Sequence, residues 1–124
     1  MYVVFAVPTK FVTKPKKTVT AYKSWDTILR CDIFGYPFPA ITWSRPLKQL
    51  PIDRHAIDGN KLTIKNARED DDGAYVCQGA NELGSVMGVI WIIVKDVGML
   101  KRIVIKNDFW FCNYFHWKLV NVNK

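Results

Sequence analysis

The residues best able to act as nucleophiles or metal ligands are three cysteines, Cys31, Cys77 and Cys112, and two histidines, His55 and His116. A thiol nucleophile needs a base beside it, and a zinc site needs several thiolate or imidazole ligands at short spacings. Neither histidine stands at such a spacing from a cysteine. We therefore predict no catalytic residue and no metal or cofactor site, and we interpret His55 as a solvated loop residue.

An acidic run, Glu69 to Asp72, is the other candidate for chemistry. Calcium loops place oxygen ligands at alternate positions and close with a glutamate, and this run has no such order. Asp71 is instead expected to form a structural ion pair with either Arg54 or Arg45. The acidic run is therefore interpreted as structural and not as a cation site.

Three cysteines allow three pairings on counting alone. Cys31 and Cys77 each lie in the middle of an alternating, strand-like run, with Trp43 between them, whereas Cys112 lies in an aromatic segment without that pattern. This context favours a Cys31–Cys77 disulfide, which should stabilise the fold by about 4 kcal/mol. Such bonds persist in oxidising compartments, so the chain is predicted to work outside the cell.

Short strands separated by turns must position these residues. Residues 26–34 give a strong signal, because Leu29, Cys31 and Ile33 alternate with residues assigned to the opposite face. Other strand-like runs cover residues 3–7, 11–13, 17–22, 41–44, 61–65, 74–78 and 85–95.

Three details of these strands bear on the fold. Pro8 is predicted to divide an N-terminal edge strand that residues 17–22 continue. Asp58 and Gly59 indicate a tight hairpin. Residues 85–95 are apolar on both faces, so their alternation does not settle which side chains point inward.

About seven short strands with inward-facing Cys, Trp, Tyr and Cys describe a sandwich of two sheets. Over residues 5–95 the chain resembles an immunoglobulin domain of the intermediate set (I-set). The residues that carry the resemblance are Cys31, the turn and tryptophan of residues 35–43, Leu62 and Ile64, the set Asp71, Gly73, Tyr75 and Cys77, and the turn residues Ala80, Asn81 and Gly84.

The resemblance implies an all-β, immunoglobulin-like β-sandwich of two antiparallel sheets with one inter-sheet disulfide. It also implies that Trp43 covers the disulfide and that Leu62 faces the core. The Tyr75 hydroxyl should turn back to the backbone at a corner, after a bend that Gly73 permits. Similar domains occur in cell-adhesion molecules, receptor ectodomains and matrix proteins, where they bind proteins through sheet faces, edges or loops and are rarely catalytic.

The predicted function is therefore an extracellular protein-recognition module of a cell-adhesion or receptor-type protein. Its protein partner is unidentified, and homophilic contact is included among the alternatives. Phe34, Tyr36 and Phe38 are candidate interface residues, because aromatic side chains near an exposed turn often anchor interfaces. The alternative is that one or two of them pack beneath the turn. The rival functions are a structural spacer in a tandem array and a basic glycosaminoglycan-binding module.

The net charge of +7 favours acidic partners through a salt-sensitive field. The densest basic run contains Lys10, Lys14, Lys16, Lys17 and Lys23, interleaved with Thr and Val rather than with stacking aromatic residues. No nucleic-acid site is predicted from it. The favoured interpretation is an edge strand on which lysines oppose aggregation.

The chain is divided into a domain of residues 1–95 and an atypical basic and aromatic tail of residues 96–124. The tail is interpreted as a segment foreign to the domain; the alternatives are a weak interfacial membrane anchor and a partner-binding tail that uses Cys112. No signal peptide and no apolar run long enough to span a bilayer is recognised. The chain is therefore interpreted as part of a longer protein or an incomplete gene product, with any firm membrane attachment supplied by the parent protein.

Overall fold

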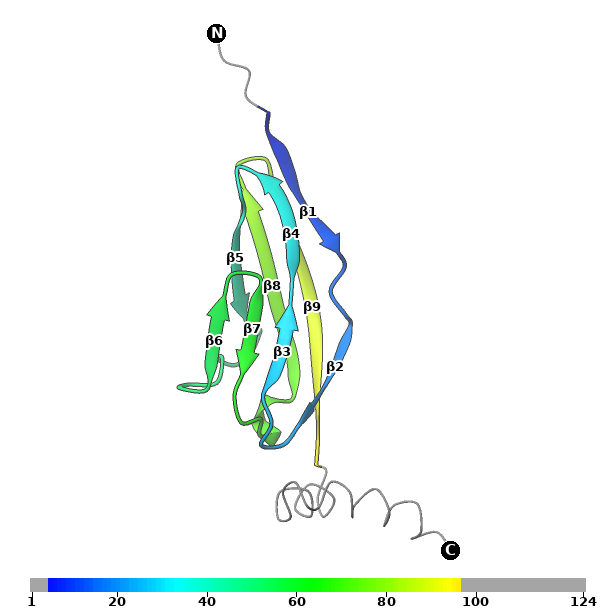
Figure 1. The fold of residues 1–124 in the computed structure, drawn as a ribbon, viewed down its shortest axis with the longest axis vertical. Coiled ribbons are helices and arrows are strands. Elements are labelled where there is room, and N and C mark those ends of the chain that lie inside the picture. The colour runs from blue at the N-terminus through cyan, green and yellow to red at the C-terminus, as the bar shows by residue number, and fades with distance from the viewer. Residues whose placement is uncertain (1–4, 97–124) are drawn as a thin grey trace, which may run out of the picture.

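The computed structural model describes residues 5–96, which form two layers of strands packed face to face (Figure 1). The elements in chain order are β1 (Val7–Thr13), β2 (Thr18–Tyr22), β3 (Thr27–Arg30), β4 (Asp32–Tyr36), β5 (Ala40–Ser44), β6 (His55–Asp58), β7 (Lys61–Ile64), the 3-10 turn η1 (Glu69–Asp71), β8 (Gly73–Asn81) and β9 (Gly84–Lys95). The all-β sandwich predicted from the alternating pattern is confirmed.

One layer contains β1 paired with β4, and β3 paired with β7, which in turn pairs with β6. β3 and β4 follow one another along the chain, and a single residue, Cys31, separates them. The Cys31 amide donates to the Asn60 carbonyl oxygen at 2.8 Å. The other layer has the strand order β2-β9-β8-β5. Each layer turns alternate side chains toward the other, which accounts for the period of two in the sequence.

The N-terminal segment differs from the prediction in two ways. β1 runs unbroken through Pro8, and the chain changes layer near Pro15 so that β1 and β2 belong to different sheets. Pro8 is tolerated because β1 is an edge strand, where a missing backbone donor costs little. Because the chain keeps its direction as it crosses, β2 pairs in parallel with β9, whereas the other ladders are antiparallel as expected.

The structure settles the register of β9. Cys77 of β8 lies opposite Gly88, and Tyr75 lies opposite Ile90, so the set that includes Ile90 and Ile92 faces the core. Trp91 and its alternate neighbours consequently face solvent. The choice depends on the partner strand, because both faces of β9 are apolar.

The core lies between the layers around the cysteines. Its fully or nearly fully buried apolar members are Ala21, Leu29, Cys31, Ile33, Trp43, Leu62, Ile64, Ala67, Tyr75, Cys77, Ile90 and Ile92. Gly88 lets the N-terminal segment close over this core: an added Cβ there would lie 2.8 Å from Pro15 Cγ and 3.1 Å from Phe11 Cζ. The absence of a side chain at Gly88 thus allows the segment that joins β1 to β2 to lie against β9.

Candidate functional site

The two layers are joined covalently at their centre. Cys31 and Cys77 form a disulfide with an S–S distance of 2.05 Å and a Cα–Cα distance of 6.4 Å, and both residues are fully buried. The pairing favoured from sequence is confirmed. Cys112 lies outside the described residues.

Trp43 lies beside this disulfide, directly opposite Cys77 in the ladder between β5 and β8. Its ring is almost fully buried, and its Nε1 donates to the Gly59 carbonyl oxygen at 3.3 Å. Leu62, on β7, is fully buried in the same core. The indole therefore lies in the core beside the disulfide, and its N–H donates to the hairpin between β6 and β7.

Tyr75 ties the start of β8 to the turn before it. Its buried hydroxyl donates to the Asp71 carbonyl oxygen at 2.8 Å. Gly73, between the two residues, has a φ of 126°, a conformation that side-chain-bearing residues rarely adopt. Burial raises the pKa of the Tyr75 phenol to about 12, although the nearby positive charge of Arg45 acts in the opposite direction.

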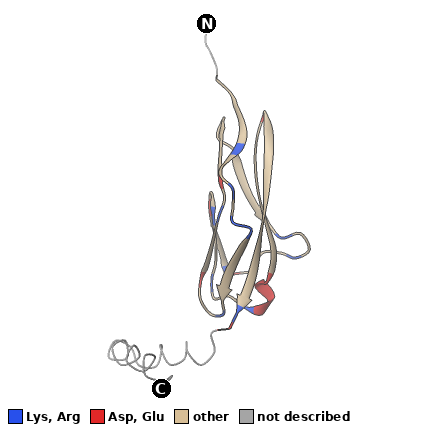
Figure 2. Ribbon diagram, turned by 90° about the vertical axis from the view of Figure 1, so that its right-hand side faces the viewer, with Lys and Arg blue, Asp and Glu red and all other residues tan. Residues whose placement is uncertain are grey.

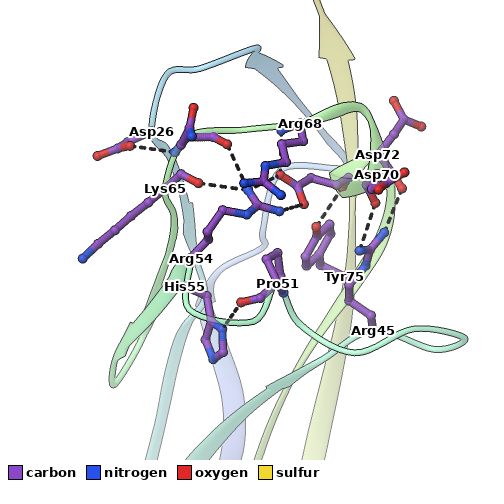
Figure 3. Close-up of polar contacts among 12 residues, drawn as sticks. Asp26, Arg45, Pro51, Arg54, His55, Lys65, Arg68, Asp70, Asp72 and Tyr75 are labelled. Carbon is purple, nitrogen blue, oxygen red and sulfur yellow. Dashed lines mark hydrogen bonds and ion pairs between the residues drawn. The ribbon is translucent and has the colours of Figure 1, made fainter.

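Asp71 is held by Arg54, which comes from the loop before β6. Figure 3 shows the Arg54 side chain with its hydrogen bonds as dashed lines. Arg54 Nη1 donates to Asp71 Oδ2 at 2.9 Å and Nη2 donates to Oδ1 at 2.8 Å, while the Arg68 amide also donates to Oδ2 at 2.8 Å. Burial alone would raise the pKa of this carboxyl. The hydrogen bonds from Arg54 and Arg68 and the charges of Arg54 and Arg45 outweigh it, so the pKa lies below its usual value.

Of the two arginines predicted as partners of Asp71, the structure thus selects Arg54. Arg45 has a different role: it donates to the carbonyl oxygens of Asp70 at 3.2 Å and Asp72 at 2.8 Å, and its guanidinium lies 4.6 Å from the centre of the Tyr75 ring. The acidic run is therefore occupied with intramolecular bonds. Within residues 5–96, no group of three or more metal-ligating side chains is found.

The sequence did not indicate two further contacts. Asn81 Nδ2 donates to the Val7 carbonyl oxygen at 2.8 Å and to the Pro37 carbonyl oxygen at 3.1 Å, so it fastens the turn between β8 and β9 to two other segments. The sequence marked Asn81 only as a turn residue. His55 was expected in a solvated loop, but it begins β6, is half-buried, and its Nδ1 lies 2.6 Å from the Pro51 carbonyl oxygen.

The three candidate interface aromatics lie on β4 and the turn that follows it, and all are exposed, with Phe38 at 79%. Phe34 and Phe38 come together along an open groove of about 560 Å³, which Val12 and Ile41 also line. Tyr36 does not line this groove. The structure therefore brings two of the three aromatics to one concave surface, and none of the three is buried beneath the turn.

The fold places the lysines of the predicted basic run in different parts of the domain. Lys14 and Lys16, with Arg30, line an opening of about 360 Å³ at the junction of β1 and β2. Lys23 instead lies near η1, whose acidic residues gather at the end of the sandwich where β9 finishes (Figure 2). Its Nζ is 2.6 Å from Glu69 Oε1 and 3.6 Å from Asp96 Oδ2, and the hydrogen bond to Glu69 is the main cause of its raised pKa.

Among the described residues, β9 is the strand furthest along the chain and ends at Lys95; residues 97–124 of the predicted tail lie outside the described part. Among residues 5–96, no helix has the length and apolar character required to span a membrane.

These features correspond to a known family. Residues 9–94 match the model of the immunoglobulin I-set domain, so the chain belongs to that family. The buried disulfide, the tryptophan beside it and the tyrosine at the corner all fall within the matched region.

Curated relatives include proteins named for cell adhesion. The chain is 32% identical over 87 residues to neural cell adhesion molecule L1 of Mus musculus, which covers 68% of this chain and 7% of that protein. It is 32% identical over 75 residues to hemolin of Hyalophora cecropia, covering 60% and 18%, respectively. Contactin-5 of Mus musculus is 30% identical over 96 residues, covering 75% and 9%. The chain therefore spans less than a fifth of the length of each of these three relatives.

Solved structures agree with the fold. Sidekick-1 immunoglobulin domains 1–5 match with a TM-score of 0.67 and 30% identity, covering 74% of this chain and 20% of that one. The insect immune protein hemolin, described with implications for homophilic adhesion, matches with a TM-score of 0.66 and 28% identity, covering 73% and 23%.

Proposed function

We propose that this chain is an extracellular protein-recognition module of a cell-adhesion or receptor-type protein and that it has no catalytic activity. The observation that carries the proposal is its I-set membership together with similarity to neural cell adhesion molecule L1, hemolin and contactin-5. The buried disulfide supports an oxidising location. Because one fold serves many functions, a binding role has to be argued from particular residues on the surface of the domain.

The groove lined by Phe34 and Phe38 is the contact surface we assign to this role. Exposed aromatic side chains beside a concave apolar surface are the groups that most often dominate protein interfaces. Asp32 and Asp58 also line the groove, so its polar edge includes acidic side chains. A basic or uncharged apolar loop of a partner protein fits this combination.

The test is binding of the full-length chain, displayed as a tetramer, to intact cells. A protein partner predicts binding that is lost after surface proteolysis and is reduced at least about tenfold by Phe38→Ser. Leu47→Ser is the matched control, since Leu47 is almost fully exposed in the loop between β5 and β6 and should bind as the wild type does.

Two other outcomes would replace the proposal. Binding that survives proteolysis but is lost after heparinase treatment would assign a glycosaminoglycan ligand, in keeping with the basic opening around Lys14, Lys16 and Arg30. No binding to any cell type tested, with a normally folded domain, would favour a spacer that only sets distance between its neighbours.

A further inference from the structure

One face of the sandwich lacks charge along most of its length. The outward residues of β2, β9, β8 and β5 are Thr18, Thr20, Tyr22, Ser85, Met87, Val89, Trp91, Ile93, Ala74, Val76, Gln78, Ala80, Ala40, Thr42 and Ser44, together with Lys95. Within these four fully described strands, Lys95 is the one charged outward residue, and it stands at the end of β9 opposite Tyr22. We call the remaining fifteen residues the neutral face.

The strand pairing confirms that these side chains share one surface. Trp91 lies opposite Ala74 on one side and Thr18 on the other, and Val89 lies opposite Val76. The outer surface of the other layer is different, because Arg30 faces Lys61 there. The lack of charge is therefore a property of this sheet and not of the whole molecule, which carries a net charge of +7.

The side chains of the neutral face also differ in size from strand to strand. The outward side chains Met87, Val89, Trp91 and Ile93 of β9 are large, apolar and between 43% and 62% exposed. The outward residues of β8 and β5 are mostly small, and those of β5 are Ala40, Thr42 and Ser44. A ridge along β9 thus runs beside a shallow trough over β8 and β5. Contiguous exposed apolar surface of this kind marks a binding surface in soluble proteins.

The chemistry of the face indicates what covers it. A contact between two identical copies about a twofold axis sets one patch against itself, so a patch of one charge sign would repel its own copy. The neutral face avoids this repulsion, whereas most other approaches bring together two molecules that each carry +7. In such a contact the β9 ridge of one copy enters the trough of the other, in the way that two sheets interdigitate in a sandwich core.

The size of the face is sufficient for a weak dimer. The four strands contain 31 residues, and strand spacing and rise give about 16 Å² for each, a flat area of roughly 490 Å². Two such faces bury roughly 1,000 Å² before side-chain relief is added, which is in the range of weak, transient interfaces. Weak association of single domains is sufficient when several copies act together on opposed surfaces.

We propose that the neutral face is a homophilic contact surface, at which the β2-β9-β8-β5 sheet of one copy packs against the same sheet of a second copy. This inference rests on the proposed recognition function and names one partner for it. It concerns a surface separate from the groove of Phe34, which is on β4 of the other layer, and Phe38, which is in the turn between β4 and β5.

The test is sedimentation equilibrium of the full-length chain carrying Cys112→Ser, which prevents a disulfide-linked dimer while leaving the Cys31–Cys77 bond intact. At loading concentrations from about 10 μM to about 1 mM, the chain should form a dimer and no larger species. Added salt should leave the association unchanged or strengthen it, because salt screens the repulsion between two +7 molecules and no ion pair holds the interface.

Two charged variants locate the surface. Val89→Glu should weaken the dimer at least about tenfold, because a carboxylate would be desolvated at the interface. Ile28→Glu is the matched control: it places the same charge at an outward β-branched residue of the other layer, with 48% exposure against 43% for Val89. Its dimer constant should stay within about twofold of the wild type. Thr42→Glu, which removes no apolar side chain, should weaken the dimer as Val89→Glu does and decides the matter if the Val89 variant does not fold.

A monomer over the whole concentration range, equal effects of the Val89 and Ile28 variants on the dimer, or an association that added salt weakens would overturn the inference. A monomer that still binds cells through Phe38 would leave the recognition function standing and remove only the homophilic face. A chain that neither dimerises nor binds cells would remove both.

Discussion

Arg54 holds both carboxylate oxygens of Asp71, with Nη1–Oδ2 and Nη2–Oδ1 distances of 2.9 Å and 2.8 Å, while the Tyr75 hydroxyl donates to the carbonyl oxygen of the same aspartate. Asp71 therefore connects the loop before β6, the 3-10 turn η1 and the start of β8. Its side chain is almost fully buried and that of Arg54 largely so. Two-point pairing of this kind fixes geometry more firmly than a surface ion pair does.

Asp71→Asn should destabilise the domain by about 3 kcal/mol at pH 7, because Arg54 would keep a largely buried charge without its counterion. The low pKa of Asp71 means that the unfolded state binds more protons as the pH falls, so the stability from this group is present above about pH 4 and is lost below it. Denaturant unfolding at pH 7 and pH 3 should show a smaller acid loss for the variant than for the wild type.

The control for this experiment is Asp70→Asn, one residue earlier in the same turn and exposed at its side chain. It should change stability by less than about 0.5 kcal/mol at pH 7. Equal acid losses for the wild type and Asp71→Asn would show that the Arg54 pair is not a source of the pH dependence.

Tyr75→Phe removes the hydroxyl that bonds to the Asp71 carbonyl and should cost about 1 to 2 kcal/mol at neutral pH. The folded-state pKa of Tyr75, about 12 against an ordinary value of 10.0, means that the folded state retains a proton that the unfolded state loses. Stability from this group is thus complete below about pH 10 and falls by roughly 2 to 3 kcal/mol as the pH rises through 12.

Unfolding measured between about pH 9 and pH 12 tests this, with Tyr36→Phe as the control because Tyr36 is exposed. The Tyr36 variant should keep the alkaline loss of the wild type, and the Tyr75 variant should show a smaller one. Identical slopes in all three proteins would contradict the effect of burial on Tyr75.

Trp43→Ala should destabilise the domain by about 3 to 5 kcal/mol, because loss of the buried ring leaves a cavity beside the disulfide and an unsatisfied Gly59 carbonyl. Lys16→Ala, at an exposed position, should be nearly neutral. Thermal unfolding of the two variants under oxidising conditions measures the difference, and equal melting temperatures would contradict a core role for Trp43.

Peptide mapping of the unreduced full-length chain should find Cys31 linked to Cys77 and Cys112 as a free thiol. The first expectation follows from the fully buried bond between the layers, which reagents do not reach in the folded state. A peptide that links Cys112 to Cys31 or Cys77 would contradict it.

The sequence predicted the residues that point inward wherever one face of a strand is polar. Leu29, Cys31 and Ile33 are buried as the alternation required, because a half-buried strand must place apolar side chains on one face. The pairing of Cys31 with Cys77 followed from the same pattern. These features depend on local periodicity and on spacings within the chain, which can be read without knowledge of the neighbouring strands.

Other features depended on contacts between distant segments. Alternation did not choose between Arg54 and Arg45 as the partner of Asp71, because loop conformation decides which guanidinium reaches the carboxylate. It also placed β1 and β2 in one broken strand, whereas the chain crosses between the layers near Pro15.

By itself, the sequence determined a disulfide-linked β-sandwich and the inward residues of the strands that have one polar face, because burial imposes a period of two on such strands. Only the tertiary structure decided which residues of β9 face outward. Both faces of β9 are apolar, and the pairing of Cys77 with Gly88 fixes which face meets the core. The tertiary structure also decided which strands lie beside β9 and therefore that an uncharged surface exists. Such a surface arises from strands far apart in the chain, and no local pattern encodes their adjacency.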